Sequence, residues 1–82
     1  MERKYEVGDE YFSEKILAAV LLGFRTVNNP VSVTVHPELM IKIRAHFRNK
    51  VIAPKRVGDA EMFCGLTVIE DATKDRTHIS VS

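Results

Sequence analysis

The first apolar pattern along the chain has the spacing of a helix. Apolar residues recur at intervals of three and four between residues 10 and 24, which predicts an amphipathic helix there. Asp9 is placed to cap its start, and Gly23, followed by turn residues at 28–30, is expected to end it. The residues expected to face the core are Phe12, Ile16, Ala19, Val20 and Gly23.

Three leucines of the same helix, Leu17, Leu21 and Leu22, fall outside that stripe. The second half of the helix is therefore apolar almost all round, and such a helix needs cover on more than one side. A chain of 82 residues has few elements with which to supply that cover. We therefore expect the protein to form a homo-oligomer through these leucines.

A strand and a second helix follow. Residues 31–35 alternate apolar and polar and are rich in valine, which predicts a strand. Pro37 suits the first position of a helix, which we expect to run over residues 37–48. Its apolar arc comprises Leu39, Met40, Ile43 and Phe47.

The C-terminal third predicts a loop and two more strands. Residues 49–63 contain proline and glycine among mixed polarity, which favours a loop with one short extended piece at residues 51–53. Residues 65–71 and 77–82 have strand patterns separated by a polar turn, so we expect them to form a hairpin. The helix over 37–48 is a crossover that would make the strands on either side of it parallel if they are neighbours.

These elements predict an α+β protein, a small single domain over residues 1–82 with the order α-β-α-β-β and helices packed on a small mixed sheet. Hydrophobic residues make up 45% and charged residues 28% of the chain, as in ordinary globular domains. No apolar run approaches the length of a membrane span and the first residues are charged, so we expect neither a membrane anchor nor a signal peptide, and a cytoplasmic location. The single cysteine, Cys64, excludes an intrachain disulfide and a cysteine-based zinc motif.

Charge is distributed unevenly along the chain. Residues 25–56 hold seven basic residues and one acidic residue, whereas the segments on both sides have an excess of acidic residues. Either the chain's own acids neutralise this basic segment, mostly Glu61, Glu70, Asp71 and Asp75, or it meets an acidic protein or a nucleic acid. The residues of this candidate interaction site are Lys42, Arg44, Arg48, Lys50, Lys55 and Arg56.

No pattern of residues indicates catalysis, a cofactor or a metal. His36, His46 and His78 have no ligand spacing, and His36 is placed to cap the helix that follows it. Acidic residues of the last turn, such as Asp71, are typical of turns, and Cys64 has no activating base nearby. We therefore expect a protein that is not an enzyme and has no cofactor.

One stretch of the chain resembles a segment of tailed-bacteriophage proteins, in which a strand, a helix opened by His-Pro, a loop and a strand with an acidic turn follow one another. Major capsid proteins of the tailed-phage fold have such a segment in their outer domains, and short phage proteins resemble it alone. The chain lacks the long spine helix and extended arm of a shell subunit. The residues that carry the resemblance are His36, Pro37, Leu39, Ile43, Gly65, Leu66, Val68 and Asp71.

The resemblance implies a phage or prophage protein that acts by contact with itself, with a virion protein or with a host protein, in the host cytoplasm or the virion. Two alternatives remain open. The basic segment over residues 42–56 also fits a nucleic-acid-binding module, and a small inhibitor of a host defence complex would use the same charged surfaces.

Overall fold

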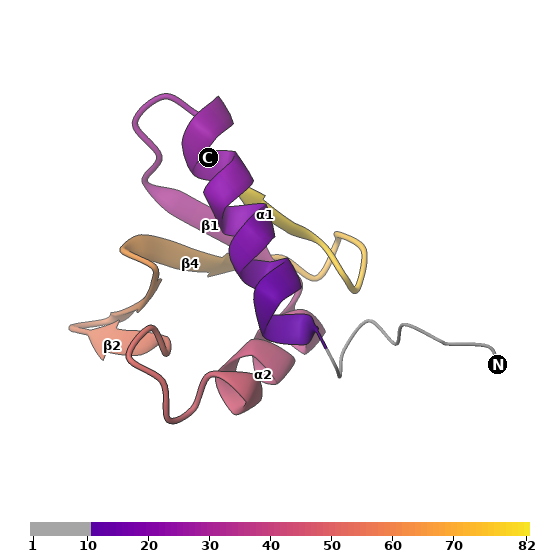
Figure 1. The fold of residues 1–82 in the computed structure, drawn as a ribbon, viewed down its shortest axis with the longest axis vertical. Coiled ribbons are helices and arrows are strands. Elements are labelled where there is room, and N and C mark those ends of the chain that lie inside the picture. Colours follow the sequence, from indigo (N-terminus) through magenta and orange to yellow (C-terminus); the bar gives the residue numbers. More distant parts are fainter. Residues whose placement is uncertain (1–10) are drawn as a thin grey trace, which may run out of the picture.

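Two helices and a five-stranded sheet make up the part of the chain that the structure, a computed structural model, describes, residues 11–82. Figure 1 shows that α1 lies across the sheet and that α2 lies near the N-terminal end of α1. The fold is α+β, and the predicted elements occur in the predicted order with one additional hairpin, β2–β3. In chain order the elements are α1 (Phe12–Thr26), β1 (Ser32–Val35), α2 (Pro37–His46), β2 (Lys55–Val57), β3 (Ala60–Phe63), β4 (Leu66–Glu70) and β5 (Ile79–Val81).

The sheet is mixed, with the strand order β2-β3-β4-β1-β5. β1 and β4 are parallel neighbours, which confirms the expectation for two strands joined through α2. The predicted hairpin between the last two strands is wrong, because β5 pairs antiparallel with β1, Thr34 opposite Ser80. β4 already has β1 on one side and β3 on the other, so no edge of β4 is left for β5.

The β2–β3 hairpin lies where the sequence pattern predicts mostly loop. Lys55 pairs with Met62 and Val57 with Ala60 around a two-residue turn. The short extended piece expected at residues 51–53 is not a strand, since residues 51 and 52 form a turn instead. Alternation of apolar and polar residues is absent from β2 because all three of its side chains are exposed.

Both helices cover the same face of the sheet. Val33 and Val35 of β1 are fully buried on that face, in one cluster with residues of α1, α2, β3 and β4. Alternation along β1 places Ser32 and Thr34 on the opposite face, where the Ser32 hydroxyl lies 3.0 Å from that of Ser82. The core comprises Phe12, Ile16, Val20, Val33, Val35, Leu39, Met40, Ile43, Phe47, Phe63 and Leu66.

α1 buries the predicted stripe except that Ala19 is only half-buried. The helix ends at Thr26, two residues later than expected, so Gly23 does not end it. Instead, Gly23 lies inside the helix against Val81 of β5, where the absence of a side chain permits close approach. The expected cap at Asp9 lies outside the described residues.

α2 begins at Pro37 as predicted, and its apolar arc is buried. It is two residues shorter than expected, because it ends at His46 and Phe47 follows as its C-terminal cap. Phe47 has no exposed surface, and its ring lies 5.3 Å from that of Phe63 in β3. This aromatic pair joins the end of α2 to the β2–β3 hairpin.

Candidate functional site

Arg44 of the predicted basic set is paired with acidic residues of the sheet. Its Nε donates to Glu61 Oε2 at 3.0 Å and its terminal nitrogen to Glu61 Oε1 at 2.8 Å, a two-point contact. The same guanidinium also donates to Glu70. Arg44 thus joins α2 to β3 and β4, and within the basic segment it has a structural role.

The hydrogen bonds from Arg44 lower the pKa of the Glu61 carboxyl below its usual value. Glu61 is largely covered, with 14% of its side chain exposed, so its charge depends on Arg44 for compensation. Loss of Arg44 would remove the guanidinium that bridges Glu61 and Glu70 and leave Glu61 with only the weaker influence of Arg56 on the facing strand. The pairing therefore contributes to the stability of the sheet at neutral pH.

We expect Arg44→Gln to lower the free energy of unfolding at pH 7 by about 1 kcal/mol. A lowered folded-state pKa of Glu61 stabilises the protein above the unfolded-state value, about 4.3, and this contribution is lost as the pH falls through the folded-state pKa. Urea unfolding measured from pH 7 to pH 3 should show that the difference in free energy of unfolding between wild type and Arg44→Gln decreases as the pH falls. Arg48→Gln, in the loop just after α2, is the control, and a difference in free energy of unfolding that stays constant with pH would contradict this role of Arg44.

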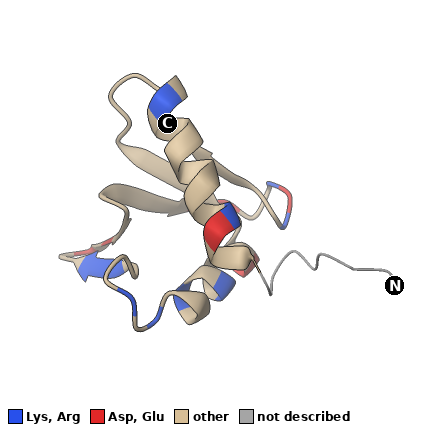
Figure 2. Ribbon diagram, viewed as in Figure 1, with Lys and Arg blue, Asp and Glu red and all other residues tan. Residues whose placement is uncertain are grey.

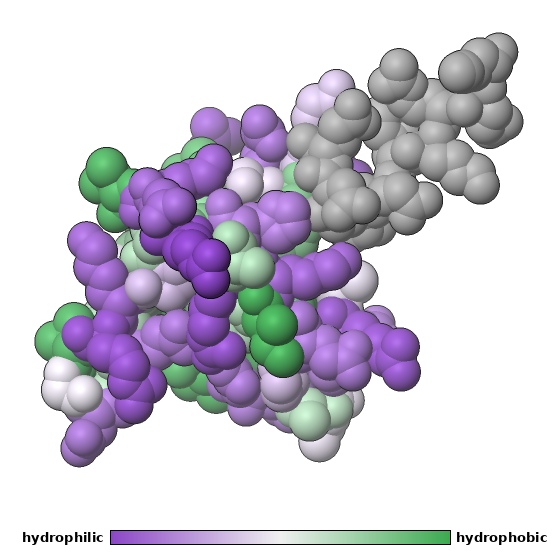
Figure 3. Space-filling model, turned by 90° about the horizontal axis from the view of Figure 1, so that it is seen from below, coloured by the Kyte–Doolittle hydropathy of each residue, from purple (hydrophilic) through white to green (hydrophobic). Residues whose placement is uncertain are grey.

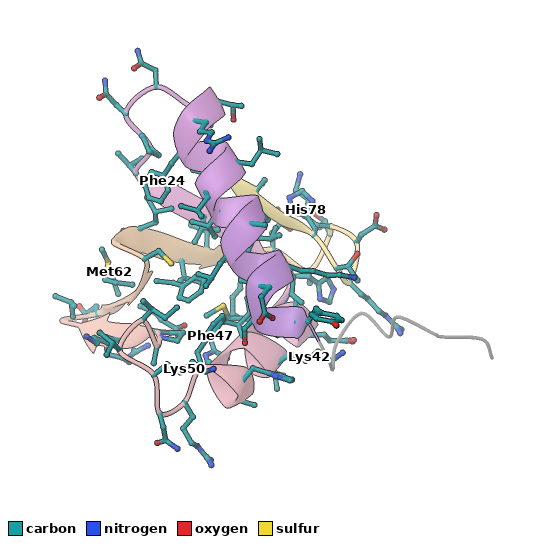
Figure 4. All side chains as sticks on the ribbon, in the orientation of Figure 1. Phe24, Lys42, Phe47, Lys50, Met62 and His78 are labelled. Carbon is teal, nitrogen blue, oxygen red and sulfur yellow. The ribbon has the colours of Figure 1, made fainter. Side chains whose placement is uncertain are left out.

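Lys42 lies apart from the other basic residues. Its ammonium group is 5.9 Å from the centre of the Phe12 ring, within the range of a cation–π contact. Figure 4 shows Lys42 and Lys50 toward opposite sides of α2. Lys42 also lines a separate shallow pocket together with Glu38 and Arg76. It belongs to the contact between α1 and α2 rather than to a continuous basic surface.

The four remaining basic residues lie in the loop after α2 and on β2, and we call them the basic end: Arg48, Lys50, Lys55 and Arg56. All four are exposed, and among the described residues none has an ion pair within 4 Å. Arg56 lies opposite Glu61 in the hairpin, and its charge helps to lower the pKa of that carboxyl. Figure 2 shows this run of basic residues along the loop after α2 and on β2. The predicted interaction site is therefore reduced to these four side chains.

A groove of about 260 Å³ lies beside the basic end. Lys55 and Val57 of β2 line it together with Met62 of β3, because alternate residues of a strand point to the same face. Figure 3 views the molecule from the end that carries α2, and shows a mostly hydrophilic surface with hydrophobic patches toward the side of β2. The remaining lining residues are Val51, Ile52, Ala53, Cys64 and Gly65.

The three histidines have structural contacts. His36 Nδ1 accepts a hydrogen bond from the backbone N–H of Glu38 at 3.0 Å, which confirms its expected role as a cap. The His46 ring lies 4.5 Å from the ring of Phe12, and His78 Nε2 lies 2.9 Å from the Ser80 hydroxyl oxygen. None of these contacts brings two histidines together.

Cys64 and Asp71 also occupy structural positions. Burial raises the pKa of the Cys64 thiol, so the reactive thiolate is disfavoured. Asp71 accepts hydrogen bonds from the backbone N–H and the hydroxyl of Thr73, which lower the pKa of its carboxyl. Asp71 thus stabilises its own turn.

α1 provides a second candidate surface. Leu21 and Leu22 are 61% and 60% exposed, in agreement with their position outside the predicted core stripe. Leu17 is only partly available, because it packs against the core. Phe24 is also 41% exposed and lies one helical turn after Leu21, although it was not among the residues expected to form this surface.

Neither a metal site, a membrane span nor a similar protein points to a function for this chain. Among residues 11–82, no group of three or more His, Cys, Asp or Glu side chains is placed to hold a metal ion. In the same range no helix has the length and apolar character needed to cross a membrane. No protein-family model, curated protein or solved structure matches the chain.

Proposed function

We propose that this chain is a non-enzymatic phage or prophage protein that works by protein contact, and that it associates with a second copy of itself through α1. The observation that carries the proposal is the outward face of α1, which is apolar in the middle and has one acidic and one basic residue at its two ends. The phage origin rests on the motif residues that begin at His36 and Pro37.

α1 has no charged residue over nine consecutive positions, 16–24, so the part of its outward face in that range is uncharged. Figure 2 shows this stretch between the charged residues near each end of the helix. A rotation of 100° per residue places five exposed residues on one side of the helix. They are Glu14, Ala18, Leu21, Leu22 and Arg25.

Two copies of this face are complementary when the helices pack antiparallel. A two-fold axis between residues 19 and 20 places Glu14 of one copy opposite Arg25 of the other, and Ala18 opposite Leu21. Neither Glu14 nor Arg25 has an ion pair within the described part of its own chain. The small Ala18 side chain allows the two helices to approach closely where Leu21 must fit.

The alternatives receive less support from the contacts. Arg44 is neutralised and Lys42 lies over Phe12, so the continuous basic surface that a nucleic-acid-binding module would use is reduced to the basic end. The histidines, Cys64 and Asp71 have structural contacts, and no pair of them forms an activated nucleophile.

We expect sedimentation equilibrium at micromolar concentrations to show a dimer that Leu21→Glu converts to a monomer. The substitution places two like charges close to the two-fold axis, in an apolar contact. Ile41→Glu is the matched control, because Ile41 is equally exposed, at 62%, but lies on α2. A wild-type protein that remains monomeric up to about 100 µM, near −5 kcal/mol of association free energy, would refute the proposal.

The antiparallel orientation of the two α1 helices can be tested separately. Glu14→Arg and Arg25→Glu should each weaken the dimer, since each places like charges opposite one another. The double variant exchanges the two charges and should restore association. Parallel packing would instead place residue 14 of each copy near residue 14 of the other, so its like-charge pairs would persist in every variant. Single variants that leave the dimer as strong as wild type would therefore contradict the antiparallel arrangement, as would a double variant that does not restore it.

A further inference from the structure

We propose that the free edge of β2 binds an extended acidic segment of another protein, which adds to the sheet as a sixth strand. The site consists of the backbone of Lys55, Arg56 and Val57, the groove beside them and the basic end. It is distinct from the outward face of α1, so it does not depend on the association proposed above.

β2 is the outermost strand of the sheet and pairs only with β3. Gly58 has a φ of +65°, which fits the first central position of a type II′ turn. In such a two-residue hairpin the flanking residues Val57 and Ala60 form the hydrogen-bonded pair, so the next pair, Arg56 and Glu61, does not. The backbone N–H and C=O of Arg56 therefore point to the free edge.

These groups of Arg56 lack a partner within the described chain. No backbone hydrogen bond outside the β2–β3 ladder involves residues 55–57 among the described residues. An unpaired strand edge is a template for another strand, and main-chain hydrogen bonds then supply much of the affinity. The edge is short, so contacts from side chains must add to it.

The positive charge of β2 determines which kind of segment can pair with its free edge. Lys55 and Arg56 on an edge strand oppose pairing with a second copy of β2, since cations would then lie opposite cations. An acidic segment reverses that interaction and also neutralises Arg48 and Lys50, for which the described chain supplies no ion pair. The preferred occupant is thus an acidic segment and not another β2.

The groove adds a preference for one apolar residue. Lys55 and Val57 face the groove, whereas Arg56 faces the side of α2 because successive residues of a strand alternate. A segment paired with β2 would place acidic side chains opposite Lys55 and Arg56 and an apolar side chain opposite Val57. Val57 is 63% exposed, so this contact would remove apolar surface from water.

A protein segment fits this surface better than a nucleic acid. Binding of single strands relies on exposed aromatic rings on which bases stack. Phe47 and Phe63 are the aromatic residues nearest to the basic end in sequence, and both are buried. The free edge and the apolar groove are features that a phosphate backbone would not use.

The test is titration of the full chain with a labelled nine-residue peptide, threonine-rich, that contains Val-Glu-Glu-Val and so can place glutamates opposite Lys55 and Arg56 and a valine opposite Val57 in either strand direction. We expect saturable binding that is lost when lysines replace the glutamates and when alternate amides of the peptide are N-methylated. The double variant Lys55→Glu with Arg56→Glu should bind the glutamate peptide at least about tenfold more weakly than wild type does. The same variant should bind the lysine peptide instead. Lys74→Glu, in the turn between β4 and β5, is the control for charge and should change binding by less than about twofold.

Hydrogen exchange followed by NMR distinguishes strand addition from loose attraction between charges. The amide of Arg56 should exchange at least about tenfold more slowly in the presence of the glutamate peptide, because a ladder hydrogen bond covers it. Three results would overturn the proposal: equal binding of the N-methylated peptide, an unchanged exchange rate at Arg56, or binding of duplex or single-stranded DNA but not of the peptide.

Discussion

Phe47→Ala is expected to lower the free energy of unfolding by about 3–5 kcal/mol, a large part of the stability of the protein. Phe47 has no exposed surface, and its ring packs against that of Phe63. The substitution leaves a cavity between the end of α2 and β3 that the surrounding side chains fill only in part. A domain of this length has a free energy of unfolding of roughly 4–12 kcal/mol, so the variant should unfold at a much lower urea concentration.

Two comparisons separate the causes of that loss. Phe24→Ala removes the same atoms from a partly exposed position on α1 and should cost about 1 kcal/mol or less. Phe47→Leu keeps most of the volume but removes the contact between the two rings, which is worth roughly 0.5–1.5 kcal/mol. If Phe47→Ala destabilises the protein no more than Phe24→Ala, the end of α2 is not packed on β3 as described.

Phe47 also bears on the proposed peptide site. It is the last residue before the loop that contains Arg48 and Lys50, and it fixes that loop to the β2–β3 hairpin through Phe63. Loss of this contact would allow the basic end and the groove to move relative to one another. Under conditions in which Phe47→Ala remains folded, we therefore expect weaker binding of the glutamate peptide.

The predictable parts of the fold are those whose sequence pattern reports burial directly. The stripe from Phe12 to Gly23 and the arc from Leu39 to Phe47 each place one apolar face on the same core. Valines at alternate positions of β1 report a strand with one buried face. These patterns arise from local geometry, so one sequence suffices to recognise them.

Strand pairing and the β2–β3 hairpin depend on contacts between residues distant in the sequence. β2 has three exposed side chains, so no alternation marks it, and its clearest signal is the Gly58 turn between Val57 and Ala60. The position of β5 beside β1 follows from the occupation of both edges of β4, which no local pattern reveals. Neighbouring strands in sequence are often paired, and here that tendency gave the wrong partner.

The candidate site, like the fold, could be predicted from the sequence only in part. The charge distribution along the chain identifies the basic segment and gives four acids that could neutralise it, Glu61, Glu70, Asp71 and Asp75. Two of the four, Glu61 and Glu70, bond to a cation of that segment. Only the fold shows that Arg44 alone reaches both of them, because β3 and β4 bring residues 61 and 70 to the same side of α2. The separation of the basic end from Arg44 could not be predicted without that pairing.

Gly23→Ala is expected to destabilise the protein by about 1–3 kcal/mol, although alanine is the better helix former. A Cβ at residue 23 would lie 2.4 Å from both Cβ and Cγ2 of Val81, far inside van der Waals contact. In an exposed helix the same substitution would stabilise by about 1 kcal/mol, so the sign of the effect reports the contact between α1 and β5. Urea unfolding of the single variant measures it.

A second substitution at residue 81 identifies the atom responsible. Val81→Ala removes Cγ2 but keeps the Cβ, which is equally close, so it should not relieve the clash with Ala at residue 23. Val81→Gly removes both atoms, and in the double variant with Gly23→Ala the two losses should be less than additive by at least about 0.5 kcal/mol. Strict additivity of Val81→Gly and Gly23→Ala would show that α1 does not pack on β5 at this point, and the expected cost of Gly23→Ala would then have another origin.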